Sequence, residues 1–362
     1  MKMNIIEIIP TLGTGGGERF VIDLSNAFAN LGHEVTILTL FDLSEKDVLR
    51  HFVQSNVKIA SLSKRKGMDI KCMYRLYRFI RLNKPEIVHV HLGAIIYILI
   101  SAIFIRKVNF YATIHSEAKR EAGIRLSKWI RFLLFKLRLV APITISPESE
   151  KSFISFYKRS GFMIPNGCSE YQLDTNNLRQ FKNFRHGIDY LFLHAGRIQE
   201  VKNQIMLLKA FSRLIQNGIR ARLLIAGRVE DPKLFEEMKP YFSENIVYIG
   251  EQKDIKSILS ICDAFCLSSK MEGMPITIIE AFSVGCIPIV TPVGGCVNMI
   301  RNRENGFISE NIEEDAYYKS LLDFIKTEKS ALNKIIDNIK QDFQANYSIN
   351  ITASKYIEYF RS

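Results

Sequence analysis

Two carboxylates, Glu272 and Glu280, stand eight positions apart in the second half of the chain. This spacing is a little over two helical turns, and a proline suits the first position of a helix because its missing N–H is not needed there. We therefore expect a helix from about Pro275, with Glu272 in the preceding loop and Glu280 on the second turn. Backbone amides at such a helix start bind anions or sugar hydroxyls. The donors would be the N–H groups of Gly273, Met274 and Ile276.

Two cations stand close together earlier in the same half. Arg197 and Lys202 bracket a loop that follows a predicted strand at 191–194 and precedes an apolar helix. Gly196, at the start of this loop, permits a close approach of the backbone to a ligand. Cations beside a helix start suit a diphosphate, because they add hydrogen bonds and charge to the helix dipole. Further strands of this sheet are expected at 222–227, 245–250 and 263–269, with turns that face the same ligand.

The first half places a histidine at a strand end. His115 directly follows a predicted strand at 111–114. Ligands of open parallel sheets bind outside the carboxyl ends of the strands, so His115 is a candidate for substrate contact. The other strands expected in this half are 4–9, 35–40, 86–91 and, as the last, 143–146.

Strands, glycine loops and apolar helices alternate through both halves. The chain opens with a strand at 4–9, a glycine loop at 13–17 and a segment whose apolar residues recur at helical spacing. The same alternation starts again after residue 188. At 362 residues the chain is too long for one ordinary core. We predict an α/β protein with two Rossmann-like, doubly wound domains.

The first glycine loop leaves a dinucleotide-binding interpretation open. Gly13 and Gly15 fit the first two glycines of the G-x-G-x-x-G pattern, but Glu18 stands where the third glycine would be. Asp42, after the second predicted strand, could be the carboxylate that binds the ribose of NAD. An NAD(P)-dependent oxidoreductase is therefore an alternative function.

His89 and His91 lie on one face of the predicted strand at 86–91, because side chains alternate along a strand. They could be metal ligands, but no third ligand is evident beside them. The chain also lacks a zinc-type cysteine spacing and an Asp-x-Asp pair. We therefore expect two hydrogen-bonded core histidines and no metal site.

The net charge of +12 belongs entirely to the first half. Residues 1–165 contain 25 lysines and arginines against 13 acidic residues, whereas residues 166–362 contain 24 of each. This excess suggests an anionic partner for the first half: a membrane surface, a nucleic acid or a phosphorylated acceptor. A basic nucleic-acid-binding protein is an alternative, but it would leave the charged constellation of the second half unexplained.

Composition indicates a reduced, cytoplasmic protein. The six cysteines contain no C-x-x-C pair. Glu7 interrupts the first apolar run, so no secretory signal is expected. The longest nearly apolar run, 94–105, is shorter than the roughly 20 residues that cross a bilayer as a helix.

Two basic segments, 64–82 and 119–139, have apolar residues at helical spacing. An ordinary helix packed on the sheet accounts for the first. The second adds Trp129 and Phe132 to its basic side chains, which suits a helix in the interface of an anionic membrane. A helix with a solvated basic face is the alternative for this second segment.

Several of these segments resemble motifs of family 4 glycosyltransferases, which are retaining enzymes of the GT-B fold. Residues 272–295, EGMPITIIEAFSVGCIPIVTPVGG, resemble the Glu-x7-Glu signature, and residues 196–202 match the pattern G-R-x-x-x-x-K. The glycine loop, the strand with His89 and His91, and the segment around His115 resemble further motifs in the same order. At 164–169, Cys168 and Ser169 replace the Val-Asp that is common in the family.

The resemblance implies roles for the matching side chains. Arg197 and Lys202 would stabilise the departing diphosphate, while Glu272 and His115 would contact the donor sugar. Glu280 would accept hydrogen bonds from the ribose. The implied catalytic residues are Arg197, Lys202, Glu272 and His115. The other implied donor-binding residues, beside Glu280, are Gly16, Gly17, Gly196, Gly250, Glu251, Gly273, Met274, Pro275 and Ile276.

The resemblance also implies a domain order and a reaction. The parts are an acceptor-binding domain at 1–165, a linker at 166–188, a nucleotide-sugar-binding domain at 189–342 and a helix at 343–362 that crosses back. The two domains would face a central cleft. The reaction would move a hexose from a nucleotide-sugar, with UDP favoured over GDP, to a glycan or polyprenyl-linked acceptor in capsule or O-antigen synthesis. No cofactor or metal is implied. A GT-B epimerase or phosphorylase would share the same cleft.

Overall fold

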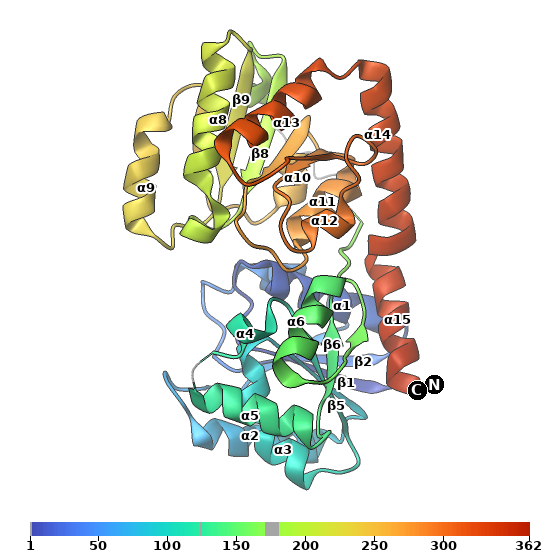
Figure 1. Ribbon diagram of the computed structural model, residues 1–362. Coiled ribbons are helices and arrows are strands. Elements are labelled where there is room, and N and C mark those ends of the chain that lie inside the picture. Colours follow the sequence, from blue (N-terminus) through green and yellow to red (C-terminus); the bar gives the residue numbers. More distant parts are fainter. Residues whose placement is uncertain (1, 124, 171–180) are drawn as a thin grey trace. The chain divides into compact units, whose positions relative to one another are not determined.

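The computed structural model describes residues 2–123, 125–170 and 181–362. The chain forms two compact units: Met1–Ser169 with Ile349–Ser362, and Glu170–Ser348. Each unit contains one parallel β-sheet covered by helices (Figure 1). The linker expected at 166–188 includes residues 171–180, which lie outside the described residues.

The sheet of the first unit has seven strands in the order β3-β2-β1-β4-β5-β6-β7, and every neighbouring pair is parallel. This is the order of a doubly wound sheet, which changes direction between β1 and β4. The strands are β1 (Asn4–Ile9), β2 (Glu34–Thr39), β3 (Lys58–Ser61), β4 (Ile87–His91), β5 (Asn109–Ile114), β6 (Ala141–Thr144) and β7 (Phe162–Met163). The expectation that the strand at 143–146 ends this sheet is wrong, because the two-residue β7 pairs with β6.

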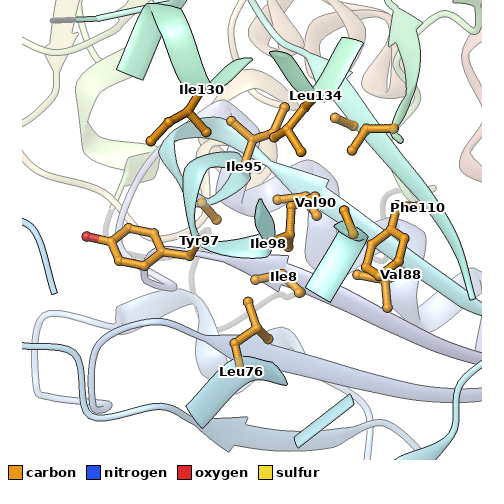
Figure 2. Packing of buried hydrophobic residues seen from close by; sticks show 14 of the residues in the cluster. Ile8, Leu76, Val88, Val90, Ile95, Tyr97, Ile98, Phe110, Ile130 and Leu134 are labelled. Atoms are coloured by element: carbon orange, nitrogen blue, oxygen red, sulfur yellow. The ribbon is translucent and has the colours of Figure 1, made fainter. Parts of the chain in front are cut away.

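Helices cover both faces of this sheet. They are α1 (Gly16–Asn30), η1 (Val48–Phe52), α2 (Ile70–Asn83), η2 (Leu92–Ile98), α3 (Leu99–Phe104), α4 (Ala118–Glu121), α5 (Arg125–Lys136), α6 (Pro147–Tyr157) and α15 (Ile349–Arg361). Figure 2 shows part of the core on one face, where Ile95 of η2 lies near Val90 of β4 and Ile130 of α5. These apolar side chains are removed from water and fix the helices on the sheet.

The last helix, α15, belongs to the first unit although it ends the chain. It packs on α1, and its buried Tyr356 and Phe360 contact Phe28 with ring centroids 6.2 and 6.0 Å apart. Its apolar residues recur at helical spacing, which gives it one face to bury. The chain therefore returns to the first sheet after completing the second unit.

The sheet of the second unit repeats the same plan with six parallel strands in the order β10-β9-β8-β11-β12-β13. The strands are β8 (Tyr190–Ala195), β9 (Ala221–Ala226), β10 (Ile246–Gly250), β11 (Ala264–Leu267), β12 (Ile287–Val290) and β13 (Phe307–Ile308). This sheet changes direction between β8 and β11. The prediction of two doubly wound α/β sheets is thus confirmed.

The helices of the second unit flank this sheet. They are η3 (Lys182–Arg185), η4 (Glu200–Lys202), α8 (Gln204–Gln216), α9 (Pro232–Met238), η5 (Lys239–Tyr241), α10 (Ile255–Leu259), α11 (Ile276–Val284), α12 (Cys296–Met299), α13 (Glu314–Lys326), α14 (Lys329–Asp342) and the π-helical turn η6 (Phe343–Tyr347). The six cysteines of the chain are free and buried.

The two basic segments form shorter helices than the sequence predicted. In the first, α2 begins only at Ile70, because Asp69 caps it by accepting a hydrogen bond from the amide of Cys72. In the second, Gly123 takes a positive φ of 71° between α4 and α5. Among the described residues, no helix has both the length and the apolar character to cross a membrane.

Candidate active site

The candidate site of the second unit lies at the switch point of its sheet. β8 and β11 are neighbours in the sheet although β9 and β10 separate them in the sequence. Loops that leave two such strands run to opposite faces, and ligands of doubly wound sheets bind at this point. The two loops here are residues 196–203, which follow β8, and residues 268–275, which follow β11.

Lys202 and Glu272 join these two loops. Lys202 Nζ donates a hydrogen bond to Glu272 Oε1 over 2.6 Å, and Ser269 Oγ donates to the same oxygen over 2.5 Å. The side chains of Lys202 and Glu272 are only 18% and 10% exposed, so water screens their charges weakly. In the described part of the chain, Glu272 Oε2 has no hydrogen bond, and it is the oxygen left for a ligand.

Gly294 and Gly295 support the loop that carries Glu272. The amide of Gly295 donates to the carbonyl of Gly273 over 2.8 Å. A Cβ on Gly295 would lie 2.2 Å from Gly273 O, and one on Gly294 would lie 1.8 Å from Glu272 O. Either side chain would therefore displace the loop. The sequence analysis gave these glycines no role, although they are the last two residues of the segment 272–295 that resembles the Glu-x7-Glu signature.

Helix α11 follows this loop. It begins at Ile276, one position later than the sequence predicted, and Pro275 precedes it in an extended conformation (φ −71°, ψ 114°). Proline fixes φ near this value in both conformations, so only ψ distinguishes them. Glu280 lies on the second turn, as expected, and its side chain is buried. Gly285 ends the helix in the left-handed conformation.

Arg197 stands at the other end of the β8 loop and is half exposed. Its Nη1 lies 3.3 Å from both carboxylate oxygens of Glu230, which also accepts from Arg228 over 2.6 Å. Burial opposes ionisation of Glu230, but the two guanidinium groups lower the pKa of this carboxyl. Arg197 and Lys202 therefore lie on one loop but contact different carboxylates, Glu230 and Glu272.

Three glycines bring the neighbouring loops into backbone contact. Gly196 N donates to Ala226 O, and Gly227 N donates to Gly250 O, both over 2.9 Å. A Cβ on Gly227 would lie 1.9 Å from Gly196 O, and Gly227 has a φ of 150°. Only glycine fits there. Glu251, which follows Gly250, is exposed.

His194 lies beneath the β8 loop. Its Nδ1 donates to the carbonyl of Cys266 over 2.9 Å, and the side chain is fully buried. Burial lowers the pKa of His194 to about 4, and the nearby Lys202 acts in the same direction. A neutral histidine therefore lies beside the Lys202–Glu272 pair.

In the first unit, His115 lies beyond β5 in contact with a buried polar cluster. His115 Nε2 lies 2.9 Å from His91 Nδ1, and His91 Nε2 lies 2.6 Å from Glu7 Oε2. His89 Nδ1 lies 3.0 Å from the same Glu7 oxygen. Glu7, His89 and His91 are fully buried. The structure confirms the expectation of two hydrogen-bonded core histidines, and it adds a third group that was not evident from the sequence, because Glu7 comes from the neighbouring strand, 82 positions earlier than His89.

The glycine loop lies at the same edge of this sheet. A Cβ on Gly17 would contact the side chain of Leu92, which follows His91, at 3.3 Å. Phe20 of α1 has its ring centroid 5.9 Å from that of His115. Gly16 is the first residue of α1, two positions before the predicted helix start. The structure therefore brings Gly17 and His115 near each other.

Asp42 and Glu18, the two residues that decide the dinucleotide-binding interpretation, both make local contacts. Asp42 accepts hydrogen bonds from Ser61 Oγ over 2.8 Å and from Ser63 Oγ over 2.7 Å, and these bonds lower the pKa of Asp42. At the third glycine position, Glu18 folds back so that a Cβ on Gly15 would lie 2.3 Å from its carboxylate. The side chain thus fills space that a dinucleotide fingerprint leaves open.

A buried arginine that the sequence analysis did not single out holds the His115 loop. Arg131 of α5 is 2% exposed and contacts Glu121 Oε1 at 3.3 Å and the carbonyl of Leu92 at 3.0 Å. Glu121 Oε2 in turn accepts from the amides of His115 and Ser116. Arg131 is part of the basic segment 119–139, but its side chain is buried and faces neither solvent nor a membrane.

Comparison with protein families gives two adjoining matches. Residues 14–170 match the family model described as Glycosyltransferase Family 4. Residues 176–342 match the model described as Glycosyl transferases group 1. Together the two matches span nearly the whole chain, one on each side of the boundary between the two units.

Curated relatives match over most of their own length. The UDP-Gal:alpha-D-GlcNAc-diphosphoundecaprenol alpha-1,3-galactosyltransferase of Escherichia coli is 24% identical over 377 residues, covering 96% of this chain and 94% of the relative. A Campylobacter jejuni alpha-1,4-N-acetyl-D-galactosaminyltransferase, which acts on a GalNAc-alpha-(1->4)-GalNAc-alpha-(1->3)-diNAcBac-PP-undecaprenol, is 23% identical over 362 residues. That match covers 95% of this chain and 96% of the relative.

Solved structures share the fold over the full chain. A glycosyltransferase from Rickettsia africae aligns with a TM-score of 0.82 at 19% identity, covering 99% of this chain and 98% of that one. Anabaena HepE in complex with UDP-glucose aligns with a TM-score of 0.82 at 16% identity, covering 99% of both chains.

Proposed function

We propose that this chain, which belongs to the family 4 glycosyltransferases and has the GT-B fold, transfers a hexose from a nucleotide-sugar to a lipid-linked glycan acceptor with retention of anomeric configuration. The observation that carries the proposal is the Lys202–Glu272 pair at the switch point of the second sheet. It places a cation for a phosphate and an acid for a sugar hydroxyl within hydrogen-bond distance of each other.

Lys202 and Arg197 would act on the leaving group. Transfer breaks the bond between the anomeric carbon and a diphosphate oxygen, and forms a bond from that carbon to the acceptor oxygen. The departing diphosphate keeps the bonding electrons, and the acceptor proton passes to one of its oxygens. A partly buried ammonium that is fixed beforehand stabilises this growing charge, and loss of one such donor costs roughly 10²–10³ in rate. With two cations in this role, we propose that turnover needs no divalent metal.

The acidic groups and the start of α11 would bind the rest of the donor. Glu272 Oε2 would accept from a sugar hydroxyl, because Oε1 already receives Lys202 and Ser269. Backbone amides from Gly273 to Ile276 stand at the positive end of the helix and would donate to the same sugar. Glu280, one turn further along, would accept from the ribose hydroxyls.

The relatives favour a particular substrate class. The Escherichia coli relative is named for UDP-Gal and a diphosphoundecaprenol acceptor, and the Campylobacter jejuni relative for another undecaprenol-linked glycan. We therefore propose a UDP-sugar donor, ahead of a GDP-sugar, and a polyprenyl-diphosphate-linked glycan acceptor, used in synthesis of a surface polysaccharide. The first unit would bind the acceptor, and the second would bind the donor.

Calorimetric titration with UDP-, GDP- and ADP-sugars tests the donor class directly. We expect saturable binding of at least one UDP-sugar, and turnover that survives EDTA. Lys202→Ala and Glu280→Ala should each lower turnover with the intact donor by about 10²-fold or more. Lys209→Ala, an exposed lysine on α8, is the matched control and should leave it unchanged. Wild-type turnover in both site variants would reject this site.

We further propose that α5 attaches the first unit to an anionic membrane. Three apolar residues on one face of α5 are largely exposed: Leu126 at 50%, Trp129 at 61% and Phe132 at 42%. Arg125 and Lys136 on the same helix are exposed as well. Apolar side chains flanked by cations suit the boundary between lipid headgroups and acyl chains. Such attachment would bring the enzyme to a lipid-linked acceptor.

Trp129 is the single tryptophan of the chain, so its fluorescence reports on this helix alone. Vesicles with anionic phospholipid should shift its emission to the blue, and neutral vesicles or high salt should weaken the shift. Lys136→Glu should reduce binding, whereas Lys326→Glu in the second unit should not. An emission spectrum that ignores anionic vesicles at low salt would contradict the attachment.

A further inference from the structure

The polar cluster beneath His115 is built around one buried carboxylate. Glu7 and His89 are register partners on adjacent strands β1 and β4, so their side chains lie on the same face of the sheet. Glu7 Oε2 lies within 2.6 Å of His91 Nε2 and 3.0 Å of His89 Nδ1. A carboxylate without partners would be costly in this core, and the two imidazoles supply them.

The charge of Glu7 follows from its partners. Burial alone would raise the pKa of this carboxyl, but His89 and His91 bring it down to about 2. Glu7 is therefore ionised at neutral pH and can only accept hydrogen bonds. Both ring nitrogens that face it must carry a proton.

This requirement fixes the direction of the next two hydrogen bonds. Burial, with His89 nearby, lowers the pKa of His91 to about 4, so His91 is neutral and carries one ring proton only. That proton is on Nε2, toward Glu7, and His91 Nδ1 is an acceptor. His115 Nε2, at 2.9 Å, must then donate to it. The remaining nitrogen of His115, Nδ1, is left with a lone pair.

We propose that Glu7 and His91 are positioning residues that hold His115 in the tautomer whose Nδ1 accepts a hydrogen bond from a hydroxyl of the sugar substrate. This inference rests on the proposed function, because it takes His115 as a substrate contact. In the opposite tautomer the same nitrogen would donate, and a hydroxyl would have to meet it with an oxygen lone pair. The tautomer therefore decides whether the sugar hydroxyl donates its proton to His115 or to another acceptor.

Glu7, His89 and His91 could also be viewed as metal ligands, since their ligand atoms lie within 4.8 Å of one another. The hydrogen bonds of the two histidines contradict a metal site. Each ring nitrogen of the two histidines already has a partner, and His89 Nε2 lies 2.7 Å from Thr113 Oγ1, which lies 2.9 Å from the hydroxyl of Tyr356. A metal would have to replace the two N–H protons that the histidines donate to Glu7.

The other groups around His115 leave its tautomer unchanged. Phe20 of α1 contacts the ring edge and cannot accept or donate a ring proton. Glu121 of α4 bonds to the backbone amide of His115, and Arg131 of α5 bonds to that carboxylate. His91 of β4 is thus the described partner of the imidazole, and burial, with His91 and His89, lowers the pKa of His115 well below its ordinary value.

Two-bond ¹H–¹⁵N correlation spectra of histidine-labelled protein measure the tautomer without any substrate. The chain has seven histidines, and His115→Asn assigns the signal. We expect a pyridine-type Nδ1 and a pyrrole-type Nε2 for His115, unchanged between about pH 5.5 and 8. A proton on Nδ1, titration near the ordinary pKa, or a stoichiometric metal bound by Glu7 and His91 would each overturn the inference.

Two variants of His91 test its positioning role. His91→Gln keeps a donor for Glu7 and an acceptor for His115, so it should retain kcat/KM within a few-fold. His91→Phe keeps the ring volume but removes both bonds, so kcat/KM should fall at least tenfold. Any acid limb that it gains should lie below pH 6.5, the ordinary histidine pKa, because burial remains the largest cause that lowers the pKa of His115. Equal activity and equal pH profiles in folded wild type and His91→Phe would refute the role.

The tautomer spectra and the activity of His115→Asn together distinguish failure of this inference from failure of the proposed function. If the spectra give the expected tautomer but His115→Asn keeps full activity, the substrate role of His115 fails while the assignment of its protons stands. If His115→Asn loses activity and the spectra give the opposite tautomer, the substrate role stands and the positioning by Glu7 and His91 is refuted.

Discussion

Replacement of Gly295 by alanine is a clean test of the loop that carries Glu272. Gly295 has a φ of −63° and a ψ of −15°, which an alanine adopts without strain. The new Cβ would nevertheless lie 2.2 Å from the carbonyl oxygen of Gly273, whereas ordinary contact begins at 3.4 Å. The loop must therefore move by about 1 Å. A misplacement of this size costs on the order of 10²-fold in rate.

The assay separates donor-sugar positioning from nucleotide binding. In the proposed function, Glu272 and the amides beside it hold the sugar, whereas Glu280 and the backbone near Gly250 bind the nucleoside. Gly295→Ala should thus lower kcat with a UDP-sugar about 10²-fold, while the Kd for UDP measured by calorimetry changes by no more than a few-fold. Equal losses in both quantities would mean that the whole unit is disturbed.

Two other glycines supply the controls. A Cβ on Gly306 would lie 2.8 Å from the carbonyl of Pro288, which is a milder backbone clash in the same unit but away from the Glu272 loop. Gly306→Ala should lower stability and leave kcat unchanged. A Cβ on Gly93 would meet nothing within 4 Å, so Gly93→Ala should change neither. Folded Gly295→Ala with wild-type kcat would refute the support that we assign to Gly295.

Two further predictions concern stability. Burial lowers the pKa values of His91 and His194 from 6.5 to about 4, so the unfolded chain binds protons before the folded chain as the pH falls. The free energy of unfolding should therefore decrease between about pH 6.5 and 4. At pH 5 the decrease should be roughly 2 kcal/mol for each histidine. Urea midpoints at pH 7.5 and 5 measure this, and equal midpoints would contradict it. Arg131→Met leaves Glu121 buried without its cation and should cost about 3–5 kcal/mol, whereas Arg125→Met on the exposed side of α5 should cost less than about 0.5 kcal/mol; comparable urea midpoints for the two variants would contradict the buried pair.

The sequence predicts the fold well because its periodic patterns are strong. The strand predicted at 4–9 forms at those residues, and the helix expected from about Pro275 begins at Ile276. Short elements at the sheet edges were missed, since β7 and β13 contain two residues each and two residues show no periodicity. Helix boundaries shifted where a side chain caps a backbone amide, as Asp69 does for α2.

The candidate site could be predicted only where neighbouring residues form a pattern. Lys202 and Glu272 each lie in a recognisable motif, and the structure adds their direct bond. Glu7 and Arg131 had no such signal, because their roles depend on residues 82 positions away or on another helix. In a linear sequence, a glutamate inside an apolar strand interrupts the pattern, and an arginine in a basic helix merely continues it.

Both units keep a neutral histidine at the strand pair where their sheet changes direction. In the first unit, His91 lies on β4 beside Glu7 of β1, and in the second, His194 of β8 bonds to the carbonyl of Cys266 on β11. A protonated His194 would repel Lys202 and compete for Glu272, so its low pKa keeps that pair intact. We therefore expect that neither histidine contributes a limb to the pH profile in this interval, and a limb abolished by His194→Gln would contradict this.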